Sequence, residues 1–407
     1  MAIPRFQVYG RRWAVLLAFM LAVAFNQLLW ITFAPITGNA ATYYGVDDLS
    51  IGLLSMSFMI AYLFVSIPAS WVIDTYGFRV AVGIGAALTG IFGVMRGLVA
   101  ADYGLVLIAQ IGIAIGQPFI LNAVTKVAAR WFPIEERATA SGLGSLAMYL
   151  GILAGMLVTP FIVLRAGIPN MLLIYGAGAF AAAAGFLAVA RERPPTPPGA
   201  PGEDERALMF DGLKQVLRKR DFVVLMAIFF IGLGIFNSVS TWIEDIVRPR
   251  QFSITQAGLA GGLMIIGGIV GALTLPALSD RYRRRVPFIL ITLAAAVPGL
   301  VGLTFAGSTS LLYASSFLLG FALLSAGPIG FQYGAEIARP TPEGTSNGLL
   351  LLMGQISGIL FIFGMDAFKS PATGSMTTSL LVLIGLLFVG LLVATRLRES
   401  ALLEHGR

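Results

Sequence analysis

Long runs of apolar residues, separated by short polar segments, make up most of the sequence. Each run is close to the length of about 20 residues that an α-helix needs to cross a bilayer. The runs lack the ten-residue alternation that is typical of membrane β-barrels. We therefore predict twelve membrane-spanning helices, at 13–35, 50–73, 78–99, 104–130, 138–164, 168–190, 221–246, 254–279, 286–306, 310–337, 344–367 and 374–395.

One polar stretch, residues 191–220, divides this pattern near its middle. It contains five prolines and many charged residues, a composition that favours an extended segment without a core. We interpret 1–190 as an N-terminal six-helix bundle, 191–220 as a cytoplasmic linker and 221–407 as a C-terminal six-helix bundle. The predicted fold class is therefore an all-α membrane protein of twelve transmembrane helices in two pseudo-symmetric bundles.

A constant offset between the two halves supports an internal repeat. Asp74 and Asp280 end the second and eighth predicted helices and are 206 positions apart. Gly142 and Gly348, near the starts of the fifth and eleventh helices, have the same separation. Parallel six-helix repeats related by an axis along the membrane normal are an architecture of secondary transporters.

Composition and charge agree with this interpretation. Charged residues make up 12% of the chain and apolar ones 57%, too little charge to cover a soluble protein of this size. The net charge of +7 does not indicate nucleic-acid binding, because the basic residues flank apolar runs. Their bias towards one side predicts that both termini are cytoplasmic, in a plasma (inner) membrane. The first run, from Trp13, is too long for a signal-peptide core, and the chain has no cysteine for disulfide or thiol chemistry.

Two loops carry charged motifs on the predicted cytoplasmic side. The loop after the second helix contains Asp74, Gly77 and Arg79, and the matching loop contains Asp280 and Arg281. A carboxylate, a turn glycine and a cation at this spacing are suited to latching neighbouring helix ends. The alternative is a capped turn whose charges only set topology.

Polar side chains inside apolar runs are costly in lipid and tend to face a cavity. They occur in the first, fourth, fifth, seventh, tenth and eleventh helices. The candidates for a solute site are Asn26, Gln27, Trp30, Gln117, Tyr149, Asn237, Gln332 and Gln355. For any one of them, hydrogen bonding between helices is an equally good account.

The loop Asp74-Thr75-Tyr76-Gly77-Phe78-Arg79 resembles the signature of the major facilitator superfamily, with Ser70 in place of its first glycine. Further motifs are similar to the feline leukaemia virus subgroup C receptor-related family of haem and choline/ethanolamine transporters. These motifs are Arg11-Arg12-Trp13, Trp30-Ile31, Gln117-x-Phe119-Ile120-Leu121 and Glu343-Gly344-Thr345-Ser346-Asn347-Gly348.

The resemblance implies that Trp30, Gln117 and Gln355 occupy positions that contact choline in that family. An aromatic ring face attracts a quaternary ammonium group. Asn237 departs from the pattern, because choline-binding members have a tyrosine there. Its amide would suit a more polar ligand unless Tyr149 or Trp242 completes the aromatic cage.

Protonatable residues within the spans are few. Glu244, Asp245, Glu336 and Asp366 lie near helix ends, where they could couple transport to protons or act as gates and caps. The sequence therefore predicts a secondary transporter that moves a small polar or cationic, choline-like organic solute by rocker-switch alternating access. We expect no enzyme activity, cofactor or metal, and a functional monomer in the bilayer.

Three alternatives stay open. A multidrug or organic-anion carrier, including a haem-type one, would have the same fold. An intramembrane enzyme needs a cluster of catalytic groups that a chain with one histidine and no cysteine hardly offers. A transport-inactive receptor would leave the polar residues of the spans without a role.

Overall fold

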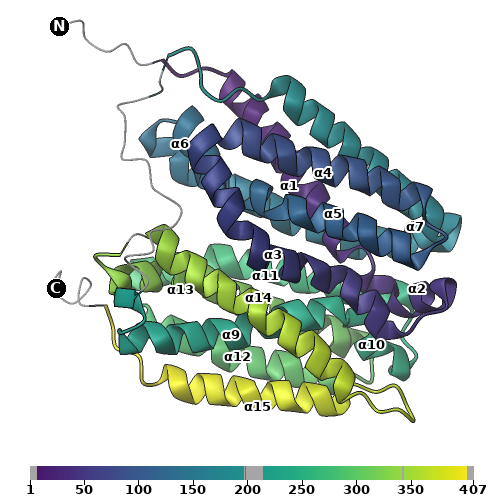
Figure 1. Ribbon diagram of the computed structural model, residues 1–407. Helices are drawn as coiled ribbons and strands as arrows, with labels where there is room; N and C mark the ends of the chain where they lie inside the picture. The colour runs from purple at the N-terminus through teal and green to yellow at the C-terminus, as the bar shows by residue number, and fades with distance from the viewer. Residues whose placement is uncertain (1–6, 197, 199–213, 342, 401–407) are drawn as a thin grey trace, which may run out of the picture. The chain divides into compact units, whose positions relative to one another are not determined.

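The computed structural model describes residues 7–196, 198, 214–341 and 343–400, and the regular structure within them is helical (Figure 1). In order along the chain the helices are α1(Arg11–Ile31), η1(Ala34–Ile36), α2(Thr37–Tyr44), α3(Asp48–Tyr76), α4(Phe78–Leu98), α5(Tyr103–Leu121), α6(Val124–Trp131), α7(Ile134–Val189), α9(Arg220–Thr241), α10(Ile243–Val247), η2(Arg248–Arg250), α11(Ile254–Tyr282), α12(Val286–Phe305), α13(Thr309–Ala338), α14(Glu343–Ala367) and α15(Thr377–Ala394).

The predicted fold class is confirmed. Among the described residues, eleven helical segments are long and apolar enough to cross a membrane. One of them, α7, has 56 residues and contains a kink at Gly167, whose φ of 77° lies in the left-handed region. This kink separates the predicted spans 138–164 and 168–190, so the eleven segments account for twelve spans.

The first and seventh predicted helices end earlier than their hydropathy suggests. The α-helix α1 stops at Ile31 and is followed by η1 and α2, and α9 stops at Thr241 and is followed by α10 and η2. Both 3-10 turns carry a proline near their start, Pro35 and Pro249, which cannot donate a backbone hydrogen bond. The two breaks occupy equivalent places in the two halves of the sequence.

The chain divides into two compact units. Unit 1 contains Met1–Thr32, Ile60–Gly155 and Phe161–Ala207, and unit 2 contains Phe33–Met59, Met156–Pro160 and Leu208–Arg407. Unit 2 thus includes η1, α2 and the start of α3, which precede the predicted linker by more than 100 positions. Residue 197 and residues 199–213 of that linker lie outside the described part of the chain.

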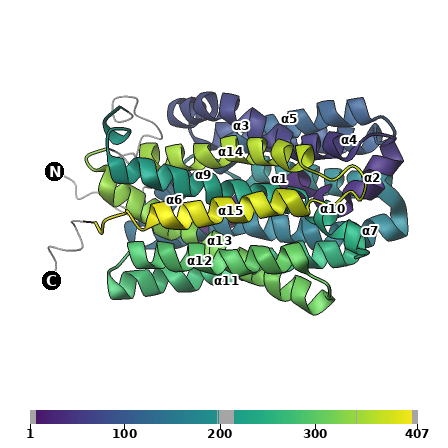
Figure 2. The same ribbon diagram turned by 90° about the horizontal axis from the view of Figure 1, so that it is seen from below.

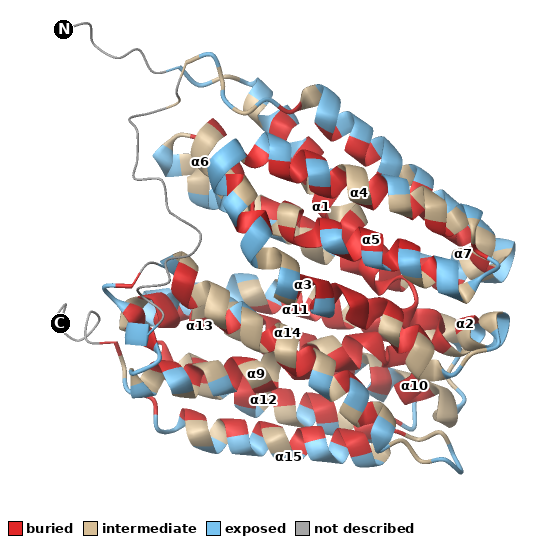
Figure 3. Ribbon diagram, viewed as in Figure 1, coloured by how far each residue is buried: buried red, intermediate tan, exposed pale blue. Residues whose placement is uncertain are grey.

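In unit 1, close helix packing depends on glycines and on an aromatic core. Gly85 of α4 and Gly116 of α5 approach so closely that a Cβ on either would lie 2.6 Å from the other's carbonyl oxygen. Phe19, Trp131 and Phe132 are almost fully buried in one apolar cluster. Figure 3 shows the corresponding buried stripes along α1 and α5.

In unit 2, α11 and α13 cross at small residues. A Cβ at Gly267 or Gly271 of α11 would overlap the carbonyl oxygens of Phe317 and Phe321 of α13. A Cβ at Gly320 of α13 would likewise overlap the Met264 carbonyl oxygen of α11. Figure 2 shows α15 lying beside α9 and α12, which it contacts along its length.

The same local arrangement occurs at the end of each half of the sequence. In unit 1 the Glu192 carboxylate accepts the Arg79 N–H at the start of α4, at 2.8 Å. In unit 2 the Glu399 carboxylate accepts the Arg285 and Val286 N–H groups at the start of α12, both at 3.0 Å. Each glutamate satisfies amides that a helix N-terminus leaves unpaired, so the repeat extends beyond the spans.

Candidate functional site

Trp30 lies in the last turn of α1 and is 6% exposed. The carbonyl oxygen of the preceding Leu29 accepts hydrogen bonds from Arg96 Nη1 at 3.1 Å and from Gln110 Nε2 at 3.2 Å. The Arg96 guanidinium also donates to Gln110 Oε1 and, at 3.5 Å, to Thr32 Oγ1. The Leu29 carbonyl before Trp30 is therefore held by side chains of α4 and α5, and the Thr32 hydroxyl after it by Arg96 of α4.

Asn26 and Gln27, one turn earlier, use their amides inside unit 1. Asn26 is fully buried, and its Nδ2 donates to Thr89 Oγ1 at 3.0 Å and to the Ile113 carbonyl at 3.4 Å. Gln27 Nε2 donates to Asn26 Oδ1 at 3.2 Å. These bonds connect α1 to α4 and α5, which is the interhelical role that the sequence left open for such residues.

Gln117 lies in α5 directly before Pro118 and is 7% exposed. Tyr149 is half-buried in α7. Both belong to unit 1, as does Trp30. With Asn26 and Gln27, the structure thus places five of the eight predicted solute residues in unit 1.

A hydrogen-bonded cluster that was not predicted from the sequence surrounds Asn122, where α5 ends. Tyr62 donates to Asn122 Oδ1 at 2.8 Å, and Asn122 Nδ2 donates to Ser66 Oγ at 3.0 Å and Ser70 Oγ at 3.2 Å. The serines and Tyr62 recur every four residues on α3, a spacing that puts them on one helix face. This four-residue spacing is the feature of the sequence from which the cluster could have been predicted.

The remaining solute candidates lie in unit 2. Asn237 of α9 donates to the Gly354 carbonyl of α14 at 3.1 Å, directly before the half-buried Gln355. A Cβ at Gly358 would lie 3.2 Å from Asn237 Cβ, so Asn237 fills the space beside that glycine. Gln332 of α13 is exposed and donates to Glu336 Oε1 at 3.0 Å.

The two motif loops pair their charges locally. Asp74 forms an ion pair with Lys126 of α6 at 3.4 Å, and Gly77 has a φ of 88° at the turn before Arg79. Asp280 pairs with Arg285, and Arg281, the other latch candidate of this loop, is exposed.

Arg285 connects Asp280 to a further acidic residue. Its Nη2 lies 3.2 Å from Glu336 Oε1, so Glu336 belongs to this charged cluster at the start of α12. Although burial alone would lower it, hydrogen bonds and charge interactions with Asp280 and Glu336 raise the pKa of Arg285.

A second group of charges surrounds the short helix α10. Asp245 pairs with Arg248 and, at 2.6 Å, with Lys369, and both cations also pair with Asp48 at 2.6 Å. Glu244 lies 3.4 Å from Arg248. We call these five residues the ion cluster, of which the sequence predicted Glu244 and Asp245. Asp366, the other acidic candidate, is half-buried near the end of α14.

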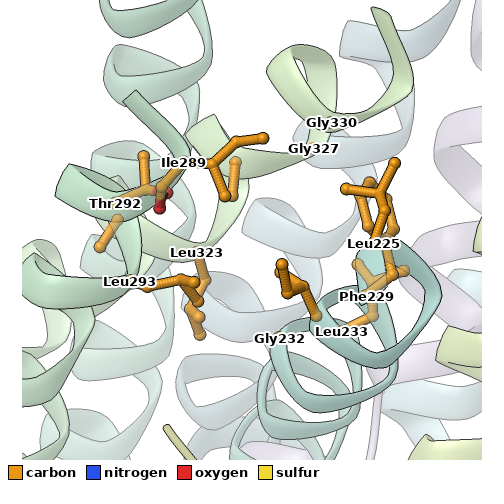
Figure 4. Close-up of a pocket in the computed structure, with 13 residues that line it drawn as sticks. Leu225, Phe229, Gly232, Leu233, Ile289, Thr292, Leu293, Leu323, Gly327 and Gly330 are labelled. Atoms are coloured by element: carbon orange, nitrogen blue, oxygen red, sulfur yellow. Dashed lines mark hydrogen bonds between the residues drawn. The ribbon is translucent and has the colours of Figure 1, made fainter. Parts of the chain in front are cut away.

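A pocket of about 430 Å³ lies in unit 2 between α9, α12 and α13 (Figure 4). Its lining is almost entirely apolar, with Phe229, Leu293 and Leu323 among the side chains drawn. Thr292 is a polar exception, but its hydroxyl donates to the Ile289 carbonyl at 2.8 Å. The predicted solute residues do not line this pocket, and its surface offers little to orient a polar molecule.

The spans, their repeat and the polar groups buried within them define a polytopic membrane transporter. Residues 8–362 match the family model described as Major Facilitator Superfamily, and the chain belongs to this superfamily. Such membership places it among transporters rather than enzymes. Solved structures of the same fold include a bacterial homologue of the human lysosomal transporter Spinster, with a TM-score of 0.79 and 17% identity over 96% of this chain and 98% of that one. A D-xylose–proton symporter has a TM-score of 0.74, 16% identity and coverages of 95% and 98%.

Related proteins of known family identify a closer group within the superfamily. The chain is 33% identical to solute carrier family 49 member A3 of Xenopus tropicalis, over 90% of this chain and 80% of the relative. It is 28% identical to the choline/ethanolamine transporter flvcr2b of Danio rerio, over 98% of this chain and 87% of the relative. The predicted resemblance to the feline leukaemia virus subgroup C receptor-related family is thereby confirmed.

Proposed function

We propose that the chain carries a small polar or cationic, choline-like organic solute across a plasma (inner) membrane. The transport would proceed by rocker-switch alternating access, with both termini cytoplasmic. The observation that carries the proposal is the buried Trp30 indole at the end of α1, next to the Leu29 carbonyl that accepts hydrogen bonds from Arg96 and Gln110. The choline/ethanolamine transporter among the relatives supports the solute class.

The proposed roles follow from side-chain chemistry. The face of the Trp30 ring attracts a quaternary or protonated amine, and a fixed ring does so without losing rotamer freedom on binding. Gln117 and Gln355 supply uncharged donors and acceptors that orient a hydroxyl group. Asn237 bonds to the Gly354 carbonyl, so we assign it to positioning Gln355 rather than to an aromatic cage.

A second candidate is an organic-anion carrier, favoured by one observation. Arg96 is fully buried, and its guanidinium contacts the carbonyl of the residue that precedes Trp30. A buried cation attracts anionic groups. The guanidinium already donates to Leu29, Gln110 and Thr32, however, so the cationic solute remains the primary proposal.

Solute binding to Trp30 variants tests the proposal. Purified protein is titrated with choline, ethanolamine and matched organic anions, and uptake is measured in proteoliposomes. Loss of a cation–π contact of about 0.5–2 kcal/mol predicts choline affinity reduced by about 2- to 30-fold in Trp30→Ala, with partial recovery in Trp30→Phe. The matched control is Trp71→Ala, because Trp71 belongs to the same unit but is 59% exposed. Binding of anions alone, unchanged in Trp30→Ala, would refute the cationic solute and support the second candidate.

A further inference from the structure

The ion cluster contains more acidic than basic groups. Asp48, Glu244 and Asp245 face Arg248 and Lys369, so the fully ionised cluster carries one excess negative charge. Asp48 and Asp245 each contact both cations, whereas Glu244 contacts only Arg248 among the ion pairs of the described residues. The excess charge therefore falls on Glu244.

Glu244 is placed where an excess charge is costly. Its side chain is 4% exposed, and its Oε2 accepts the Gly38 N–H at 2.9 Å as well as the longer contact from Arg248. Burial raises the pKa of Glu244, against the opposing effect of Arg248. The other ionisable groups on the elements around it are Tyr43, Tyr44, Asp47, Asp48, Asp245, Arg248, Arg250, Asp366 and Lys369.

The same cluster attaches one segment of unit 2, residues 37–52, to the rest of that unit. Gly38 of α2 and Asp48 at the start of α3 lie in the first half of the sequence, whereas Glu244, Arg248 and Lys369 lie in the second. A side chain at Gly38 would overlap the Arg248 guanidinium. Gly52, near the start of α3, packs against Trp242. We therefore expect the start of α3 to stay packed when the ion cluster is closed.

We propose that Glu244 is a proton-binding site that makes the attachment of residues 37–52 to the rest of unit 2 dependent on pH. With the proton bound, two carboxylates balance two cations and the cluster is neutral. When the cluster opens, Glu244 meets water, the carboxylate becomes stable and the proton is released to that water. Proton binding and closure of the cluster therefore favour each other.

The sign of the pH effect follows from this linkage. A carboxyl group whose pKa is raised in the closed cluster favours closure at low pH and opposes it as the pH rises through that raised pKa. Glutamine at position 244 imitates the protonated state at every pH. Wild type should therefore match Glu244→Gln in acid and open more readily than Glu244→Gln once the pH exceeds the raised pKa of Glu244.

Hydrogen exchange measures this directly and needs no solute. The exchange rate of the α2 amides is compared between wild type and Glu244→Gln at each pH, in the intact protein in lipid nanodiscs. The chemical exchange rate cancels in the ratio because the peptide is the same. We expect the exchange rate of wild type divided by that of Glu244→Gln to be near 1 at acid pH. As the pH rises, this ratio should increase, in total by about tenfold for each unit by which the pKa of Glu244 is raised in the closed cluster.

Two further variants keep the experiment decisive. Asp366→Asn removes a nearby carboxylate outside the ion cluster and should preserve the pH dependence of wild type. Glu244→Asp keeps a titratable group and should retain a pH dependence, which serves if Glu244→Gln does not fold. A ratio that does not change with pH, or one that Asp366→Asn abolishes equally, would overturn the proposal.

Transport forms a separate arm that rests on the proposed function. Choline uptake by wild type should vary with the pH on the side that the cluster faces, and uptake by Glu244→Gln should not. A pH-dependent exchange ratio in a protein that does not carry choline would leave the proton site standing and refute the proposed solute. Uptake by both proteins with the same pH profile would refute a role of the site in transport.

Discussion

Arg96 illustrates how a charged side chain is accommodated inside a span. It is fully buried in α4, and its guanidinium donates to Leu29, Gln110 and Thr32. The Leu29 carbonyl lies in the last turn of α1, where helix ends leave such groups without a partner in the helix. In an apolar solvent that partner must come from the protein, and here it comes from α4 and α5.

We predict that Arg96→Gln lowers stability and loosens Trp30. A hydrogen bond to a charged group contributes about 1.5–3 kcal/mol, and the shorter side chain loses those to Leu29 and Thr32, so we expect a loss of about 3 kcal/mol. Thermal unfolding in detergent gives the stability, and the emission maximum of Trp30 should move to longer wavelength. Arg165→Gln is the control, because Arg165 is exposed. An unchanged emission spectrum in a destabilised Arg96→Gln protein would mean that Arg96 does not position the indole.

At the scale of helices, the crossing of α11 and α13 requires residues without side chains. Gly267 and Gly271 have the spacing of a small-residue contact motif, and each faces a backbone carbonyl of α13. These carbonyls belong to a helix, so they cannot move aside as a flexible side chain would. The crossing therefore tolerates little added volume.

Gly267→Ala should destabilise the protein by about 1–3 kcal/mol, the usual cost of overpacking. Gly385→Ala is the matched control, because Gly385 lies in the α15 span and a Cβ added there would have nothing within 4 Å. This control should be neutral or slightly stabilising, since alanine favours helix over glycine. The melting temperatures of the two variants are compared by thermal unfolding. Equal melting temperatures would show that the crossing of α11 and α13 accommodates the added methyl group without loss of stability.

Hydropathy predicted the helices better than it predicted their breaks. Apolar residues continue past Ile31 and, with Trp242 and Ile243, past Thr241, so the spans predicted from hydropathy extend beyond both helix ends. Pro35 lies within an apolar run, where a proline indicates a kink as readily as an end, and Pro249 lies between two arginines beyond the predicted span. The choice of an end depends on tertiary partners, such as Arg96 at α1 and the ion cluster at α10.

For the whole molecule, the repeat and the family were predictable, whereas the composition of the ion cluster was not. Asp48 is 200 positions from Arg248 and 321 from Lys369. No local pattern relates such residues, and a charged residue beside a span normally indicates topology alone. The candidate solute residues came from the family resemblance and stay a prediction, because span hydropathy does not distinguish a solute contact from bonds such as those of Asn26.

The inclusion of Phe33–Met59 in unit 2 gives the last prediction. Residues 208–407 expressed alone lack Asp48, Gly38 and Gly52, so Arg248 and Lys369 lose a shared carboxylate and Trp242 loses a packing surface. We expect this fragment to be recovered in low yield with a low melting temperature. Co-expression with residues 1–207 should restore the yield and the melting temperature, because that fragment contains the missing segment. The chain is divided between residues 207 and 208, outside the described residues.

Substitutions in the co-expressed first fragment identify the contact responsible. Asp48→Asn leaves two cations with one fewer carboxylate and should weaken the restored complex by about 2 kcal/mol, less than the roughly 3–5 kcal/mol of a fully buried pair because Asp48 keeps 21% of its side chain exposed. Asp47→Asn changes the neighbouring exposed residue, whose carboxylate accepts the Ser50 N–H, and asparagine retains that acceptor. If the second fragment alone is as stable as the complex, or if both substitutions act alike, the first-half segment does not stabilise unit 2 through the ion cluster.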